Sequence, residues 1–161
     1  MFTARLVGKY LSVLNSIYVR IERIRLLRQI GLSKGRARIF LFSNPIHSNL
    51  GDQAQTFCIL EWFRKYYPDY HTICFSQEVT TDRVLQLVRA DLNTKDRLFI
   101  HSGYLFFDPH PHLPFICKII EFFKDTKIVI LPQTVNLKDD SIIQKVQQAF
   151  DNHSNLYLFC R

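Results

Sequence analysis

Polar side chains follow three of the apolar runs in this sequence, at the point where each run ends. The candidate site residues are His47, Asn49, Gly51, Asp52, Gln53, His101, Ser102, Gly103, Gln133 and Thr134. Together they offer a carboxylate, imidazoles, amides and hydroxyls, a set that suits hydrogen bonding to a polyol such as a sugar. Asp52 and His101 are the candidate catalytic bases, because a carboxylate or an imidazole can take a proton from a hydroxyl. The other eight residues are candidates for substrate binding.

Several familiar signatures are absent from the sequence. There is no G-x-G-x-x-G fingerprint and the chain has only five glycines, which argues against dinucleotide binding. There is also no lysine-containing phosphate loop of the Walker A type. The absence of a G-x-S-x-G elbow argues against a serine hydrolase of the α/β type. We therefore expect no bound cofactor.

The run Asp108, His110, His112 has the spacing D-x-H-x-H and is interrupted by prolines. An extended chain places alternate side chains on one side, as metal ligands require. No third ligand can be named for it from the sequence. A stiff proline loop before a helix is the favoured interpretation, and we expect no metal site.

Apolar runs and helical patterns alternate along residues 36–161. We expect strands at Ile39–Phe42, Tyr70–Phe75, Arg97–His101, Lys127–Leu131 and Leu156–Cys160, and helices at Asp52–Tyr67, Thr81–Ala90, Leu113–Phe123 and Asp139–Phe150. This alternation predicts an α/β domain, a Rossmann-like doubly wound parallel sheet of about five strands. Ligands bind at the carboxyl ends of the strands in such sheets. The candidate site residues are therefore expected to face a common cleft.

Residues 1–35 form a separate basic segment. Residues 1–38 hold nine Lys and Arg residues against one acidic residue, although the whole chain of 161 residues has a net charge of only +7. Residues 4–30 predict one long amphipathic helix. Its apolar stripe consists of Leu6, Tyr10, Leu14, Ile17, Ile21, Ile24, Leu27 and Ile30.

Two interpretations of this helix remain open. A basic amphipathic helix can lie on an anionic membrane surface as a peripheral contact. Alternatively, the stripe packs on the sheet domain or on a partner and leaves the arginines in water. The segment is too short and too polar for a transmembrane helix and has no signal-peptide pattern. We expect no nucleic-acid binding, because the arginines form no recognisable reading motif and the rest of the chain is not basic.

The four cysteines form no C-x-x-C pair and each lies within an apolar run. Cysteine in such a run usually acts as a small buried hydrophobe. We therefore expect reduced thiols and a cytoplasmic protein.

Four segments at matching spacing resemble the polysaccharide pyruvyl transferase family. They are N-P-I-H-S-N-L-G-D-Q-A (Asn44–Ala54), D-R-L-F-I-H-S-G (Asp96–Gly103), K-I-V-I-L-P-Q-T-V (Lys127–Val135) and N-L-Y-L-F-C-R (Asn155–Arg161). The resemblance covers about residues 36–161. It implies the first lobe of a two-lobed, glycosyltransferase-like bacterial enzyme of roughly twice this length, with the second lobe missing.

The resemblance also implies an activity. The family transfers the pyruvyl group of phosphoenolpyruvate, the donor substrate, onto two hydroxyls of a sugar, making a ketal on an exopolysaccharide or capsule. The implied partner is a saccharide or a lipid-linked oligosaccharide acceptor at the inner face of the plasma membrane. The first lobe would supply the acceptor side through Asn49, Asp52, His101 and Gln133, whereas the arginine and histidine that grip the phosphate are expected in the second lobe.

One departure from the family pattern favours an alternative. The family has consecutive glycines after its third strand, but this chain has Ser102-Gly103-Tyr104, followed by bulky Leu105 and Phe106. Bulky residues hinder close approach of a ligand to the backbone. The alternative is a non-catalytic Rossmann-like binding or assembly module in polysaccharide biosynthesis, truncated and inactive alone.

Overall fold

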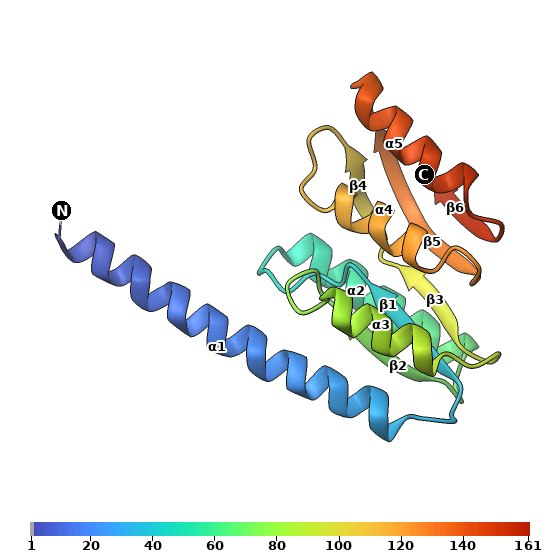
Figure 1. The fold of residues 1–161 in the computed structure, drawn as a ribbon, viewed down its shortest axis with the longest axis horizontal. Helices are drawn as coiled ribbons and strands as arrows, with labels where there is room; N and C mark the ends of the chain where they lie inside the picture. The colour runs from blue at the N-terminus through green and yellow to red at the C-terminus, as the bar shows by residue number, and fades with distance from the viewer. Residues whose placement is uncertain (1) are drawn as a thin grey trace.

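The computed structural model describes residues 2–161, with side chains from Leu14 onward, and shows a parallel sheet flanked by helices (Figure 1). In chain order the elements are α1 (Phe2–Leu32), β1 (Arg38–Phe42), α2 (Leu50–Tyr66), β2 (His71–Phe75), α3 (Asp82–Asp91), β3 (Arg97–Ile100), β4 (Gly103–Phe107), α4 (Leu113–Phe122), β5 (Ile128–Asn136), α5 (Asp140–Asp151) and β6 (Leu156–Cys160). The predicted α/β fold with a preceding helix is confirmed.

The sheet has six strands where the sequence predicted about five, because β3 and β4 occupy one position. β3 pairs with the first residues of β5, Leu98 opposite Ile128, and β4 pairs with the later ones, Gly103 opposite Gln133. Gly103 has φ +148, a backbone conformation that residues other than glycine rarely adopt. This glycine lets the chain turn after β3 and resume pairing beside the long β5.

The resulting strand order is β2, β1, β3 with β4, β5 and β6, with all pairs parallel. This is a doubly wound order that reverses between β1 and β3. In such sheets the crevice outside the carboxyl ends of the strands at the reversal point is the usual ligand site. The topology therefore points to the loops that follow β1 and β3.

The two faces of the sheet are covered unequally. The larger apolar core joins one face to α1, α3, α4 and α5. On the other face only α2 packs, with Ile59 and Phe63 against Ile39 and Phe99. Beside α2 this face carries a mainly apolar groove of about 630 Å³ that includes Trp62 among its lining residues.

A buried ion-pair network holds the amino-terminal end of β1. The Arg38 guanidinium is fully buried and donates to both carboxylate oxygens of Asp96 at 3.2 and 2.7 Å and to the Asp91 carboxylate at 2.6 Å. Burial opposes the charge on Arg38, but the hydrogen bonds to Asp96 and Asp91 outweigh it and raise its pKa. This network ties β1 to the connection between α3 and β3.

The predicted stripe of α1 does not pack on the sheet domain. Leu26 and Ile30 are buried, but Ile17, Ile21 and Ile24 are exposed, as are stripe members Leu14 and Leu27. The side chains of Leu6 and Tyr10 lie outside the described ones. Of the described stripe members only Ile30 is buried against the sheet domain, so packing on a partner and contact with a membrane surface both stay open for the rest of the stripe. Within residues 2–161 no helix is long and apolar enough to cross a membrane.

The cysteines are less buried than their apolar surroundings predicted. Cys58 and Cys160 are exposed, and Cys74 and Cys117 are half-buried. Burial raises the pKa of the Cys74 thiol to about 11, and burial together with the nearby Glu121 raises that of Cys117 to about 11. Both half-buried thiols are therefore protonated at neutral pH and poorly nucleophilic.

Candidate active site

The loop after β1 shapes the entrance to α2. Asn49 caps the helix, and its side-chain oxygen accepts a hydrogen bond from the Gly51 N–H at 2.9 Å. A side chain at Gly51 would meet that oxygen at 3.2 Å, closer than most such contacts. The Gln53 side-chain amide donates to the His47 carbonyl at 2.8 Å. Gly51 and Gln53 therefore act on the loop's shape, whereas His47 and Asn49 reach the adjoining pocket.

His101 lies where β3 passes into β4 and is only 2% exposed. Its Nδ1 is 2.6 Å from the Ser102 carbonyl oxygen, and its Nε2 is 2.9 Å from the Thr56 hydroxyl. A carbonyl oxygen only accepts, so we assign the proton to Nδ1. The single Thr56 hydroxyl proton is then within reach of both His101 Nε2 and the Asp52 carbonyl oxygen, which is 3.0 Å away. Burial lowers the pKa of His101. His101 is thus neutral with both nitrogens engaged, and it forms the pocket wall instead of a free base.

Gln133 does not face the cleft, contrary to the expectation for this residue. It is 0% exposed, and its side-chain amide donates to the His101 carbonyl at 2.6 Å and to the Leu131 carbonyl at 3.0 Å. Its role is to hold the backbone of His101 behind the pocket. Because the Gln133 side chain is fully buried, it cannot contact a ligand in the pocket directly.

Of the three remaining candidates, one lines the pocket and two do not. Ser102 lines the pocket and its hydroxyl donates to the Gln55 side-chain oxygen at 3.0 Å. Gly103 is buried within β4. Thr134 accepts a hydrogen bond from Arg161 at 2.9 Å and is not among the residues that line the pocket.

The pocket itself has a volume of about 400 Å³ and lies at the carboxyl ends of β1 and β3. Its lining residues are Ser43, Pro45, His47, Asn49, Asp52, His101, Ser102, Tyr104, Leu105, His110, Pro111 and His112. Asp52 is the one carboxylate among them, and His47 Nε2 is 3.6 Å from its Oδ2. No Lys or Arg is in this lining. A lining with one carboxylate and no Lys or Arg suits a neutral polyol better than a phosphate.

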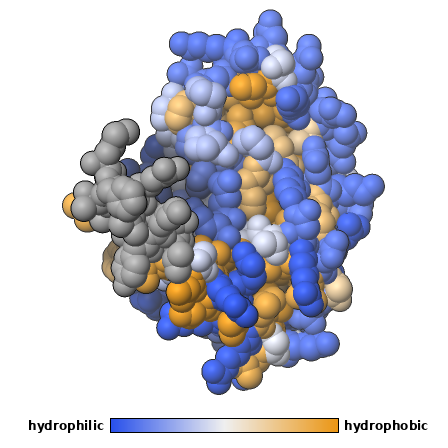
Figure 2. All heavy atoms as spheres, turned by 60° about the vertical axis from the view of Figure 1, so that its left-hand side comes forward, coloured by the Kyte–Doolittle hydropathy of each residue, from blue (hydrophilic) through white to orange (hydrophobic). Residues whose placement is uncertain are grey.

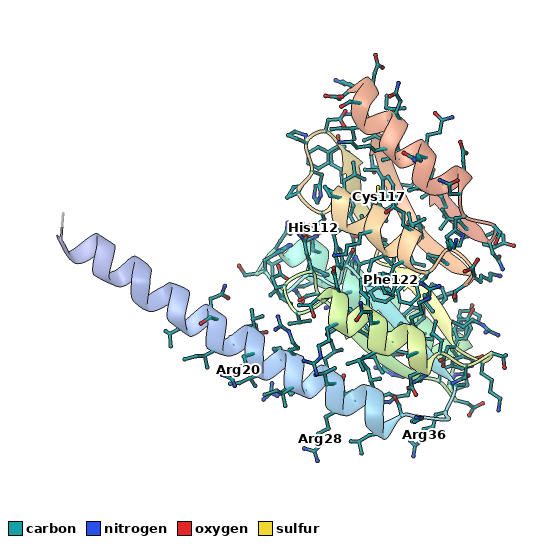
Figure 3. The ribbon with its side chains drawn as sticks, viewed as in Figure 1. Arg20, Arg28, Arg36, His112, Cys117 and Phe122 are labelled. Atoms are coloured by element: carbon teal, nitrogen blue, oxygen red, sulfur yellow. The ribbon has the colours of Figure 1, made fainter. Side chains whose placement is uncertain are left out.

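His110 and His112 belong to this pocket, which sequence reasoning did not foresee. Their rings are 5.3 Å apart between centroids, and burial lowers the pKa of each. Figure 3 shows His112 at the start of α4. No sequence signal marked them, because their loop follows β4, a strand that was not predicted and that pairs with the distant β5.

The metal-site interpretation of the D-x-H-x-H run is not supported. Asp108 instead accepts hydrogen bonds from the backbone N–H groups of Lys138 and Asp139, which ties the loop to the start of α5. Within the described part of the chain, no three His, Cys, Asp or Glu side chains are grouped as metal ligands would be.

Ser43 is a second residue that the sequence did not single out. It has φ +61, an uncommon left-handed conformation for a residue other than glycine. Its hydroxyl is buried, lines the pocket and has no hydrogen-bond partner among the described residues. A buried unpaired hydroxyl costs free energy, and strain of this kind gathers at functional sites. Both features make Ser43 a candidate for ligand binding.

Comparison with known proteins shows the family of this chain. The family model for polysaccharide pyruvyl transferase matches residues 49–161, from the cap of α2 to the end of the chain. The chain belongs to the polysaccharide pyruvyl transferase family. The earlier resemblance is thereby confirmed.

One relative of this chain is General stress protein 30 of Bacillus subtilis (strain 168). The two sequences are 28% identical over 138 residues, which is 81% of this chain and 39% of the relative. The chain thus spans about two fifths of the length of the curated relative that it matches.

Replacing Ser43 by glycine is expected to have opposite effects on the stability of the fold and on ligand binding by this family member. Glycine adopts positive φ without strain and leaves no unpaired hydroxyl, so the free energy of unfolding should rise by about 1 kcal/mol. Binding of the ligand that fills the pocket should weaken by about fivefold or more, since a hydrogen bond is lost. Urea unfolding and calorimetric titration measure the two effects. Unchanged binding would show that the Ser43 hydroxyl does not contact the ligand.

Acid is expected to destabilise this chain from about pH 6.5 downward. The pKa values of His101, His110, His112 and His153 are all lowered by burial, so the unfolded chain takes up protons first. Their contribution is complete above the ordinary histidine pKa of about 6.5 and is lost as pH falls toward the lowered folded values. Urea unfolding at pH 7.5 and 5.5 tests this.

In His101→Gln, the free energy of unfolding should differ less between pH 7.5 and pH 5.5 than in the parent chain. Replacement of the exposed His71 by glutamine is the matched control and should leave that difference unchanged. Equal free energies of unfolding of the parent chain at the two pH values would contradict the prediction.

Proposed function

We propose that the pocket around Asp52 holds a sugar acceptor of a pyruvyl transferase that makes cyclic ketals on a bacterial cell-surface polysaccharide, in exopolysaccharide or capsule assembly. The observation that carries this proposal is the lining: one carboxylate, several uncharged imidazoles, an unpaired buried hydroxyl and no cationic side chain. It lies at the reversal point of the sheet, in a chain that belongs to the polysaccharide pyruvyl transferase family.

The reaction consumes phosphoenolpyruvate and two hydroxyls of one sugar. Two C–O bonds form to the enol carbon of the donor, its bond to the phosphate oxygen breaks, and its methylene carbon gains a proton to become a methyl group. One hydroxyl proton balances that gain, and the other leaves with the inorganic phosphate. Asp52 is the group placed to accept a hydroxyl proton, with His47 close enough to share it.

The polar wall of the pocket positions the acceptor. Asn49 and Ser43 offer hydrogen-bonding groups beside Asp52, and His110 and His112 face them from the loop after β4. The ring of Tyr104 stacks on Phe107 with 4.4 Å between centroids. Because Phe106 is buried in the core, only Tyr104 and Leu105 of this bulky run border the pocket. An aromatic edge of this kind can pack against the apolar face of a sugar ring.

The donor phosphate is expected to bind elsewhere in the protein. Anionic phosphate is usually held by Arg or Lys, and this pocket offers neither. The donor is a metabolite of the cytoplasm, and we propose that the reaction takes place there, with a saccharide or a lipid-linked oligosaccharide as acceptor.

Binding of the acceptor can be tested on the 161-residue chain. Titration with neutral oligosaccharides, followed by NMR of the histidine rings, should shift the signals of His101, His110 and His112, while phosphoenolpyruvate alone should leave them in place. In the Ser43→Gly variant, which should keep the fold, the same signals should shift only at about fivefold higher oligosaccharide concentration, because Ser43 lines the pocket. Binding of neither compound would contradict the proposal and would favour the alternative of a non-catalytic assembly module.

A further inference from the structure

The outward face of α1 is apolar. The helix packs on the domain through Leu26 and Ile30, which are 4% and 6% exposed. Ile17, Ile21 and Ile24 lie roughly on the opposite side, spaced by four and three residues, and are 49%, 45% and 59% exposed. Figure 2 shows hydrophobic surface on the part of the molecule from which α1 projects. This unpartnered stripe is unusual for a helix that also has a buried side.

Arginines border the stripe on both sides. Arg20, Arg25 and Arg28 are exposed, and Figure 3 shows Arg20 and Arg28 on the side of α1 turned away from the sheet. Arg23 is different, because it turns inward and donates to the Val79 carbonyl. The nearby acid, Glu22, is paired with Arg25 at 2.6 Å. The outward face therefore combines isoleucines with an excess of positive charge.

A second copy of this chain is a poor occupant for the face. Leu14, Ile17, Ile21 and Ile24 follow the spacing of a coiled-coil seam, but the next seam position is Arg28. In a parallel pair, Arg20 of one helix would also face Arg25 of the other across the seam. These like charges repel each other, so self-association is opposed by the same residues that favour an anionic surface.

We propose that α1 docks on the surface of an anionic phospholipid bilayer through this face. The helix lies in the plane of the interface, with Ile17, Ile21 and Ile24 among the upper acyl chains and the three arginines on the lipid phosphates. Each arginine near such a surface strengthens binding by about fivefold. This contact involves no residue of the pocket and does not depend on the proposed reaction.

Sedimentation with lipid vesicles tests the proposal on the 161-residue chain. The chain should bind vesicles that contain phosphatidylglycerol and phosphatidylcholine, and should bind pure phosphatidylcholine vesicles at least tenfold more weakly. Raising the salt concentration should release part of the bound protein. Equal binding to both vesicle types, or binding to neither, would overturn the proposal.

Matched variants distinguish binding through the outward face of α1 from binding that depends only on the net charge of the chain. Arg20→Glu with Arg28→Glu should weaken binding at least tenfold, whereas Lys124→Glu with Lys145→Glu, the same charge change at exposed positions of the domain, should weaken it much less. Ile21→Ser should also reduce binding, unlike Leu87→Ser on α3. Circular dichroism checks that each variant folds.

Equal losses in the test and control variants would overturn the assignment to α1. A stable dimer in analytical ultracentrifugation that Ile21→Ser dissociates would instead assign the face to a second copy.

Discussion

Asp52→Asn is expected to lower the rate of ketal formation by the full-length protein by about 10²- to 10⁴-fold. Asp52 is the one carboxylate in the lining of the pocket, half-buried at the first turn of α2 and 3.6 Å from His47. Asparagine keeps the size of the side chain but cannot accept the proton of an attacking hydroxyl. Release of phosphate from phosphoenolpyruvate in the presence of a sugar acceptor measures the rate.

Glu61→Gln is the matched control for this variant. Glu61 is also on α2, but its exposed carboxylate pairs with Arg64 outside the pocket. The control should keep the parent rate, and both variants should keep the parent's affinity for the acceptor within severalfold. A rate for Asp52→Asn within a factor of three of the parent would remove Asp52 from the proton transfer.

Arg38→Met is expected to lower the free energy of unfolding by about 3–5 kcal/mol. Methionine fills much of the space of the buried guanidinium but leaves the buried Asp96 carboxylate without a cation, whereas Asp91 keeps Lys34 at 3.5 Å. The cost is large because the hydrogen bonds that Asp96 keeps from N–H groups of Arg38 and Asn93 do not neutralise its buried charge. Urea unfolding of the 161-residue chain measures it.

Two further variants show whether the lost ion pair is the cause. The exposed Arg64→Met, which breaks only the surface pair with Glu61, should cost less than about 1 kcal/mol. Adding Asp96→Asn to Arg38→Met should restore part of the stability, because the unpaired charge is removed. A loss for Arg38→Met no larger than that for Arg64→Met would contradict the assigned role of the network.

The loss of Arg38 should also change how the free energy of unfolding depends on pH in acid. Burial opposes ionisation of Asp91, but hydrogen bonding to Arg38 and its positive charge outweigh this and lower the Asp91 pKa. A lowered carboxyl pKa stabilises the fold above the ordinary value of about 3.9, and that stability is lost as pH falls through the folded value. In Arg38→Met this part of the acid transition should shrink, because Lys34 alone is left to lower the Asp91 pKa.

The sequence by itself determined the α/β alternation and the edge of the sheet where the site lies. Both follow from local properties. The period of the apolar residues distinguishes strands from helices, and polar residues that directly follow a parallel strand lie at the carboxyl edge of the sheet. The placement of His47, Asn49 and Asp52 beside one pocket was predictable for this reason. The family was also recognisable, since its motifs are continuous stretches of sequence.

Only the tertiary structure decided which of these residues can meet a ligand. Gln133 and His101 both end strands, yet one is sealed behind the pocket and the other has both ring nitrogens engaged. His110 and His112 entered the site because β4 continues β3, which depends on pairing with the distant β5. α1 has apolar residues on two sides, and which side packs is set by its contact with the domain, a long-range choice that helical periodicity does not contain.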